Sequence, residues 1–374
     1  MIWDMEQFNL KPDVYNADGF NEPGVKALFF KGPDYQGKQT RVFAFIGFPQ
    51  NVVGLAPGVV LVHGGGGTAS AEWVRLWNSK GYAAISMDTT GSIPDGPFPA
   101  HKKHEYGGPD GWGGFEQIDQ PTKDQWTYHA VADIILANSL LRSYNEVDRY
   151  NIGIAGISWG GYLTCIAASV DERFVFAAPV YGCGFLQQDS AWTKEKFAAM
   201  GKEKANKWSQ LWDPSSYLKD CSIPVLWVNG TNDACFPLSS YSRSYSLARN
   251  SNLCIKIALE HSHEDAFKIE EIYAFADSVC RGAQMPVMFR KQGVSARTAW
   301  TEYGHVTAPK SATFVYTTDS GAWKDRKWQE IPAAIDNIAS TISAVIPENT
   351  KLYFFNVLDD RGFVSSSKHR SPPK

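Results

Sequence analysis

The chain has 374 residues, of which 44% are hydrophobic and 20% are charged, and this is the composition of an ordinary globular protein. Its formal net charge of −3 gives no electrostatic argument for binding nucleic acid or an anionic membrane, so we predict neither as a partner. No apolar run approaches the roughly 18 residues that a membrane-spanning helix needs, and the length suggests about two domains.

The first part of the chain predicts a hairpin followed by two buried strands. Residues 1–22 show no regular pattern, and we expect a loosely structured lead-in. The runs that follow alternate in polarity or are continuously apolar, which is typical of strands. In chain order they predict an antiparallel hairpin (25–31 and 40–48), a buried strand (58–63), a helix (70–79) and a second buried strand (82–87).

Residues 89–123 predict neither a helix nor a strand. The segment is rich in Gly and Pro, and aromatic side chains such as Phe98, Trp112 and Phe115 are spread through it. A loop of this length inside a compact domain is usually functional or disordered. Because the aromatic side chains argue against disorder, we expect an ordered loop that shapes a binding site.

From residue 124 onwards, helices and strands alternate. The predicted elements are a helix (124–144), a strand (152–155), a helix (160–169), a strand (174–180), a polar insertion (183–215) with a helix (192–208), a strand (223–229), a helix (238–249), a strand (253–259) and a helix (266–281). This alternation implies a mostly parallel sheet with helices on both faces. We predict that residues 1–285 form one α/β domain.

After residue 284 the chain changes character. Short strand-like runs at 298–306, 312–317, 339–345 and 352–358 are separated by turn residues, and no convincing amphipathic helix remains. The pattern predicts a small C-terminal β-sandwich over residues 286–374. The polar tail that begins at Ser365 is expected to be frayed.

The stretch Gly156-Ile157-Ser158-Trp159-Gly160 connects a predicted strand with a predicted helix. This is the strand–turn–helix context in which G-x-S-x-G forms a nucleophile elbow. The serine oxygen then projects beside a helix N-terminus, which favours developing negative charge. Ser158 is therefore the predicted nucleophile.

A serine nucleophile needs a base, and the base needs a carboxylate that orients it. In the chain order of α/β-hydrolases, the acid and the histidine follow the serine, each at the end of a later strand. Asp233 follows the strand 223–229, and the strand 253–259 leads into Glu260-His261-Ser262-His263. We predict Asp233 as the acid and His263 as the base, because His263 lies closer to the following helix; His261 is the alternative.

The run His63-Gly64-Gly65-Gly66-Gly67 directly follows a buried strand. It matches the HGGG-type oxyanion loop, in which glycines let backbone N–H groups turn towards the substrate. We predict oxyanion donors at Gly65 or Gly66 and at Trp159. A phosphate-binding loop is the competing interpretation, but the run lacks both the Lys-Ser/Thr of a P-loop and the G-x-G-x-x-G pattern of a dinucleotide fold.

Further side chains are expected around this site. We predict that His63, Trp112 and Trp126 contact the substrate. His101 and His104 have H-x-x-H spacing, but without a carboxylate cluster nearby they predict no metal site.

The six cysteines contain no C-x-x-C pair, and several lie within predicted helices or strands, so we expect most of them to be free. Cys183 and Cys235 lie in loops near the predicted site and could form one pair. No cofactor is predicted.

Several segments together resemble a known family. They are LVHGGGGTASAEWVRLWNSKGYAAISMD, DQWTYHAVADIILANSLLRS, GISWGGYLTC, APVYGCGFL and WVNGTNDACFP. They are similar to bacterial acetyl xylan esterase-like proteins, which belong to the dienelactone hydrolase-related α/β-hydrolases. The resemblance covers residues 25–285 and implies an α/β-hydrolase fold, Ser158, Asp233 and His263 as the catalytic residues, and no metal. Glu264 and Asp265 depart from the glycine-rich continuation of the family.

We therefore expect a serine carboxylesterase that forms an acyl-enzyme and deacetylates a carbohydrate ester, so that the partner is a small-molecule or oligosaccharide ester. One alternative is a peptidase that resembles the prolyl oligopeptidase group, since Gly160-Gly161-Tyr162 fits that elbow. Another is a glycan-binding role for the sandwich. The N-terminus lacks the regions of a signal peptide, so we expect either a cytoplasmic protein or, as in many family members, an exported one whose signal has been removed.

Overall fold

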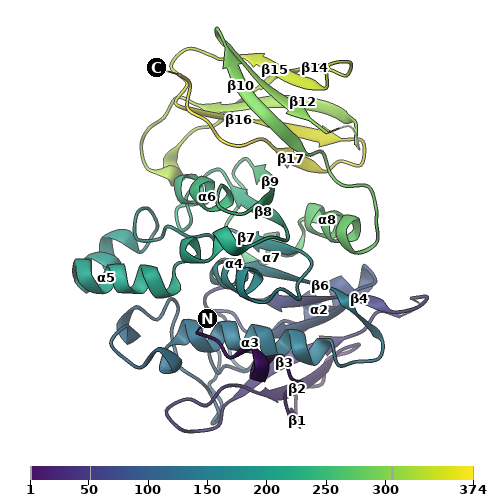
Figure 1. The fold of residues 1–374 in the computed structure, drawn as a ribbon, viewed down its shortest axis with the longest axis vertical. Helices are drawn as coiled ribbons and strands as arrows, with labels where there is room; N and C mark the ends of the chain where they lie inside the picture. The colour runs from purple at the N-terminus through teal and green to yellow at the C-terminus, as the bar shows by residue number, and fades with distance from the viewer. Residues whose placement is uncertain (1, 51, 305–306, 374) are drawn as a thin grey trace.

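One mixed sheet of thirteen strands runs through the computed structural model, which describes residues 2–50, 52–304 and 307–373 (Figure 1). In spatial order its strands are β1 (Val14–Asn16), β2 (Lys26–Lys31), β3 (Arg41–Gly47), β5 (Ala83–Met87), β4 (Ala56–Val62), β6 (Val147–Ile157), β7 (Ala177–Val180), β8 (Pro224–Gly230), β9 (Asn250–Lys256), β17 (Val364–Ser366), β16 (Leu352–Asp359), β12 (Pro309–Thr317) and β13 (Gln329–Pro332).

The strands from β5 to β9 are parallel, and the predicted hairpin pairs β2 with β3 in antiparallel register. Every residue of β4 is buried, as its continuous apolar run predicts for a strand covered on both faces. Within residues 1–285, the mostly parallel sheet with helices on both faces is therefore confirmed.

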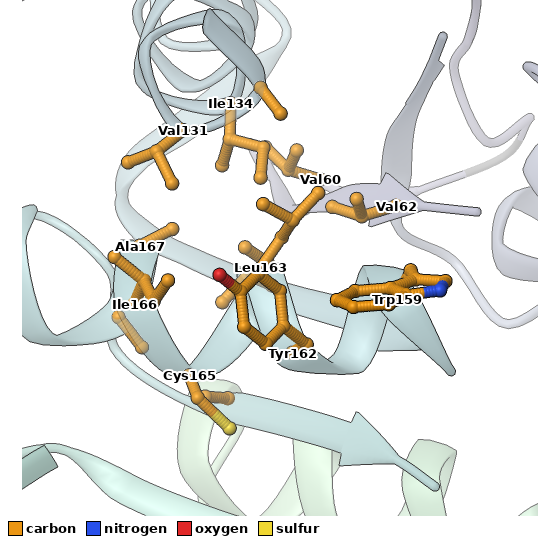
Figure 2. Close-up of a cluster of buried hydrophobic side chains, with 14 of the residues drawn as sticks. Val60, Val62, Val131, Ile134, Trp159, Tyr162, Leu163, Cys165, Ile166 and Ala167 are labelled. Carbon is orange, nitrogen blue, oxygen red and sulfur yellow. The ribbon is translucent and has the colours of Figure 1, made fainter. Parts of the chain in front are cut away.

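The alternation of side chains along β4 builds two separate cores. Val60 and Val62 face α3 (Trp126–Leu141) and α4 (Trp159–Val170), as Figure 2 shows. Val59 and Leu61 point to the opposite face and pack with residues of α2 (Ala71–Ser79) and α8 (Glu270–Cys280). The strands that carry the site are thus held from both sides.

Helix α3 lies within the predicted helix 124–144, and all of its residues are buried. Its outer side is covered by the N-terminal segment, which contains α1 (Met5–Phe8) and buries Trp3 and Phe8. The Trp3 indole donates a hydrogen bond to the Tyr128 carbonyl at 2.9 Å, and the Ser139 hydroxyl donates to the Phe8 carbonyl at 2.7 Å. The expectation of a loosely structured lead-in is therefore wrong.

The two irregular segments and the remaining helical elements connect these strands and helices along the chain. Their elements are η1 (Phe115–Gln117), η2 (Thr122–Asp124), η3 (Thr193–Phe197), α5 (Ala198–Trp212), η4 (Pro214–Ser216), η5 (Leu218–Asp220), α6 (Leu238–Tyr245) and α7 (His263–Phe267). The helix predicted at 266–281 is divided between α7 and α8. Within the described residues, no helix combines the length and apolar character that crossing a bilayer requires.

The C-terminal part forms the predicted β-sandwich. A second, antiparallel sheet contains β10 (Phe289–Ser295), β11 (Thr298–Tyr303), β15 (Thr341–Val345) and β14 (Ala334–Asp336). It packs on β12 and β16 through side chains that include Ile342, Phe314 and Phe355. Val306, which the predicted strand 298–306 includes, lies outside the described residues. The proposed division after residue 285 falls between α8 and β10.

The sandwich is joined to the sheet of the α/β domain, because β17 pairs with β9 at Ser366 and Leu253. The Ile255 N–H donates to the Ser366 hydroxyl at 2.8 Å, and the Asn356 amide donates to the Ile255 carbonyl at 2.9 Å. Ser365, Ser366 and Ser367 are buried. The prediction of a frayed tail from Ser365 is therefore wrong.

Candidate active site

Ser158 occupies the turn between β6 and α4 in a conformation that few residues adopt. Its backbone has φ 57° and ψ −117°, and its N–H donates to the Val180 carbonyl at 2.8 Å. Such a strained residue persists only where its surroundings hold it, and functional sites are the usual place. The half-buried Ser158 side chain lies at the carboxyl edge of the sheet, as the elbow motif predicts.

The glycines of the elbow are required by close backbone contacts. A Cβ atom at Gly160 would lie 2.0 Å from the Val62 carbonyl oxygen, and one at Gly156 would lie 2.2 Å from the Gly160 carbonyl oxygen. Gly182, in the next loop, would place a Cβ 2.4 Å from the Ser158 carbonyl oxygen. Strand, helix and neighbouring loop therefore meet around the serine at distances that only glycine permits.

Asp233 follows β8 and is held by its own loop. Its Oδ1 accepts hydrogen bonds from the N–H groups of Cys235 at 2.8 Å and Phe236 at 2.9 Å. Its Oδ2 lies 2.8 Å from Nδ1 of His261, and the carboxylate is buried. The acid predicted from the sequence thus forms a histidine–carboxylate pair.

The histidine of this pair is His261, so the predicted pairing of Asp233 with His263 is wrong. His263 is the first residue of α7, and its Nε2 accepts a hydrogen bond from the Gly64 N–H at 2.9 Å. Burial lowers the pKa of His263 to about 4, with further lowering from His63 and His261. His263 is therefore a neutral acceptor beside the oxyanion loop.

Two aromatic rings orient His261. Tyr181 stacks on it with ring centroids 4.5 Å apart, and Phe236 lies nearly parallel at 6.2 Å. The Tyr181 hydroxyl also donates to the Glu260 carbonyl at 2.6 Å. Sequence reasoning missed both rings, although Tyr181 directly follows a predicted strand and Phe236 lies three residues after the acid.

The oxyanion loop closes on itself through a hydrogen bond from the Gly67 N–H to the Gly64 carbonyl at 3.1 Å. Gly66 has a φ of 75°, and a Cβ at Gly65 would lie 3.1 Å from Cδ1 of Trp159. Because His263 already accepts the Gly64 N–H, the N–H groups of Gly65, Gly66 and Trp159 stay the proposed oxyanion donors. The loop is thus adjacent to the residue that follows the nucleophile.

His63 supports this loop from below. Its Nε2 accepts a hydrogen bond from the Thr89 N–H at 3.1 Å and lies 3.6 Å from the buried Asp88 carboxylate. Its Nδ1 therefore carries the proton and donates to the Gly64 carbonyl at 2.8 Å. Since only 2% of His63 is exposed, its predicted contact with the substrate is not supported.

The two predicted tryptophan contacts divide in the same way. Trp126 is fully buried and donates to the Thr89 carbonyl at 2.7 Å, so it belongs to the core. Trp112 is half-buried, and its edge meets the His63 ring at 5.7 Å. Trp112 therefore stays a proposed substrate contact.

One of the aromatic rings of the 89–123 loop is exposed and lies over the oxyanion loop. Phe98 is 63% exposed, and its ring meets that of His263 at 5.9 Å. The atoms nearest to the position of a Cβ on Gly66 belong to the side chains of Phe98 and Pro99. The irregular segment 89–123 thus borders the site, as expected for a functional loop.

All six cysteines lie in the described residues and are free, so Cys183 and Cys235 form no pair. Cys235 lies beside Asp233 and His261, and these three form the one group of potential metal ligands within the described residues. Burial raises the pKa of the Cys235 thiol to about 11, so the thiol is protonated. The carboxylate and imidazole of this group are engaged with each other. His104 packs against Phe29 at 5.0 Å, with its pKa lowered by burial.

Two family models match overlapping parts of the chain. The model of a family described as acetyl xylan esterase matches residues 2–189, which include the oxyanion loop and Ser158. The model of the prolyl oligopeptidase family matches residues 114–265, which include Ser158, Asp233 and both histidines.

Similar solved structures share the fold. An acetyl xylan esterase from a Paenibacillus species superposes with a TM-score of 0.58 at 19% identity, covering 74% of this chain and 92% of that one. Acetyl xylan esterase 1 from a Thermoanaerobacterium species gives 0.56 at 15% identity, over 73% and 93%. An acylaminoacyl peptidase from Pyrococcus horikoshii gives 0.51 at 19% identity, over 69% of this chain and 42% of that one. The catalytic part therefore has the α/β-hydrolase fold.

Proposed function

Since the chain belongs to the acetyl xylan esterase family and is a serine hydrolase of carboxylic esters, we propose that it deacetylates a carbohydrate ester through an acyl-enzyme on Ser158. The observation that carries the proposal is the His261–Asp233 pair, 2.8 Å long, beside a strained serine elbow. His261, rather than His263, is the proposed base, because it is the histidine that the carboxylate orients.

In the proposed reaction, Oγ of Ser158 attacks the ester carbonyl while Nε2 of His261 takes its proton. Asp233 accepts the Nδ1 proton of His261 in a hydrogen bond and stabilises the imidazolium. The carbonyl oxygen becomes an oxyanion between the N–H groups of Trp159 and Gly65 or Gly66. Each such donor typically contributes about 3 kcal/mol of transition-state stabilisation.

The tetrahedral intermediate then collapses. The bond to the sugar oxygen breaks, and His261 returns its proton to that oxygen, which leaves the acetyl group on Ser158. A water molecule, deprotonated by His261, attacks the acyl-enzyme through a second tetrahedral intermediate. Acetate leaves and Ser158 regains its proton, so His261 acts as base and acid in each half-reaction.

Hydrolysis of p-nitrophenyl acetate and acetylated xylo-oligosaccharides by Ser158→Ala, His261→Ala and His263→Ala variants tests the proposal. We expect Ser158→Ala and His261→Ala each to lower kcat by at least about 10⁴-fold, the loss typical of triad members. Mass spectrometry of the wild-type protein during turnover is expected to detect an acetyl adduct. A folded Ser158→Ala protein that retains turnover would exclude the serine mechanism.

The match to the prolyl oligopeptidase family favours a second candidate, a peptidase that uses the same triad. Tyr162 follows Gly160 and Gly161, which is the elbow pattern of that group. Proline-containing p-nitroanilides assayed beside acetyl esters separate the two. A kcat/KM for the amide above that for every acetyl ester would favour the peptidase, whereas we expect the esters to be preferred.

A further inference from the structure

The loop between β12 and β13 of the sandwich, residues 318–328, reaches the catalytic part beside the proposed acid. It contains the short helix η6 (Trp323–Asp325). The side-chain amide of Asn232, the residue before Asp233, lies 2.8 Å from the Arg326 carbonyl, 3.2 Å from that of Trp323 and 3.3 Å from that of Lys324. One amide of the acid loop is therefore surrounded by three carbonyls of the C-terminal sandwich.

The other end of the Asn232 side chain continues this connection into the histidine loop. Oδ1 of Asn232 accepts a hydrogen bond from the Thr231 hydroxyl at 2.7 Å. That hydroxyl in turn accepts from the Ala258 N–H at 3.1 Å, in the turn between β9 and His261. Ala258 has a positive φ of 51°. The same network thus joins the sandwich to the loops of both Asp233 and His261.

A second anchor fixes the loop on its other side. The indole N–H of Trp323 lies 3.2 Å from Oδ2 of Asp189, in the insertion that follows β7. The Ser239 hydroxyl donates to the same oxygen, and the Arg326 guanidinium lies 3.5 Å from the Trp323 ring centre. The Ala191 N–H donates to the Cys235 carbonyl at 3.2 Å, so the insertion also contacts the acid loop.

The sandwich and the α/β domain are also joined at a second place, away from the acid loop. At the junction of β9 with β17, the side-chain amide of Asn356 donates a hydrogen bond to the Ile255 carbonyl at 2.9 Å. That bond joins a side chain of β16 to the backbone of β9 and involves neither Asn232 nor the 318–328 loop. The attachment of the sandwich therefore does not by itself require a loop against the catalytic acid.

We propose that the 318–328 loop of the C-terminal sandwich is part of the catalytic unit, with Asn232 and Thr231 as positioning residues that hold the Asp233 and His261 loops in register. This inference rests on the proposed roles of Asp233 and His261. Catalytic groups misplaced by about 1 Å lose roughly 100-fold in rate, so small shifts of these loops are expected to lower kcat. Because the side chains of Asn232 and Thr231 bond each other and backbone groups, KM is expected to change little.

The test uses full-length variants with acetyl ester substrates. Asn232→Ala, the isosteric Asn232→Asp and Thr231→Val are each expected to lower kcat by about 10- to 100-fold with KM within about threefold of wild type. Asn232→Gln keeps an amide donor and is expected to recover part of the loss. Circular dichroism and thermal unfolding identify any variant that fails to fold. Asn232→Asp and Thr231→Val keep the shape of the side chain, so misfolding is least expected in these two.

Asn356→Ala is the matched control. It removes the side-chain hydrogen bond at the junction of β9 with β17 and should leave kcat within about threefold of wild type. The proposal is overturned if the folded Asn232 variants keep wild-type kcat, or if Asn356→Ala lowers kcat as much as Asn232→Ala. Loss of activity in Ser158→Ala, measured in parallel, tests the proposed esterase mechanism independently of this result.

Discussion

The backbone N–H of Gly64 donates a hydrogen bond to Nε2 of His263 across 2.9 Å, although 199 positions separate the two residues in the chain. The bond connects the start of the oxyanion loop with the first turn of α7. His63 donates to the carbonyl of the same glycine, so histidines fix both backbone polar groups of Gly64. The loop that would stabilise the oxyanion is thereby held in place before the substrate arrives.

Replacing His263 is expected to slow the reaction less than replacing His261. His263→Ala frees the Gly64 N–H, and we expect kcat to fall by about 10- to 100-fold, whereas His261→Ala removes the proposed base and costs at least about 10⁴-fold. Steady-state kinetics with p-nitrophenyl acetate measures both. A His263→Ala variant as inactive as His261→Ala would assign the base to His263.

An added methyl group at Gly66 is expected to impair catalysis specifically. Gly66 has a φ of 75°, and its Cβ would lie 2.6 Å from the Pro99 side chain. Gly66→Ala must therefore shift the oxyanion loop or the 89–123 loop, and we predict a loss of kcat of about 10²-fold. Thermal unfolding serves as the control, and an unchanged kcat in the folded variant would argue against Gly66 as a donor.

Gly160→Ala is expected to destabilise the protein, because its Cβ would lie 2.0 Å from the Val62 carbonyl and 2.6 Å from the His63 carbonyl. Backbone atoms cannot yield as a flexible side chain can, so we predict a loss of more than about 3 kcal/mol together with activity. Gly321→Ala is the matched control for stability, since nothing lies within 4 Å of its Cβ. Urea unfolding of both variants gives the comparison.

Buried histidines predict loss of stability in mild acid. Burial lowers the pKa of His129 and of His263 to about 4, and that of His369 to about 3. An unfolded histidine titrates near 6.5, so between pH 6.5 and about 4 the unfolded state binds more protons. The free energy of unfolding therefore falls as the pH falls through this window, by up to about 1.4 kcal/mol per pH unit for each histidine.

His129→Phe isolates the contribution of His129 to the pH dependence of the unfolding free energy, because the other titrating groups stay in place. We expect the difference in unfolding free energy between pH 7 and pH 5 to be smaller in this variant than in wild type by about 1 to 2 kcal/mol. Urea titrations at the two pH values measure it. An equal difference in both proteins would show that His129 is not held neutral.

The elbow, the parallel strands and the acid were predictable because each depends on a local pattern. Gly156 to Gly160 fixes a turn, the apolar runs fix buried strands, and chain order places Asp233 two strands later. The choice between His261 and His263 could not be predicted, because the two histidines are two residues apart and their side-chain directions depend on tertiary structure. One signal was present: Ser262 caps α7 by accepting the Asp265 N–H at 3.0 Å. A capping box of this kind places His263 inside the helix and His261 in the free loop.

The burial of His63 and Trp126 was equally hidden, because a side chain next to a motif can face either the cavity or the core. The continuation of the catalytic sheet into the sandwich was missed for another reason. Strand β17 is a short, serine-rich segment whose pattern is that of a polar tail. It is buried between β16, which directly precedes it in the chain, and β9, which lies far away in the sequence.

The junction of β9 with β17 also bears on how the chain avoids self-association. A catalytic sheet that ended at β9 would present unpaired N–H and C=O groups, which are a template for pairing with another chain. The three residues of β17 and the Ser366 hydroxyl occupy part of that edge. Shortened versions of the chain that lack the sandwich would therefore expose β9 as an unpaired edge strand. Their precipitation would indicate strand pairing between molecules and would say nothing about the chemistry at Ser158.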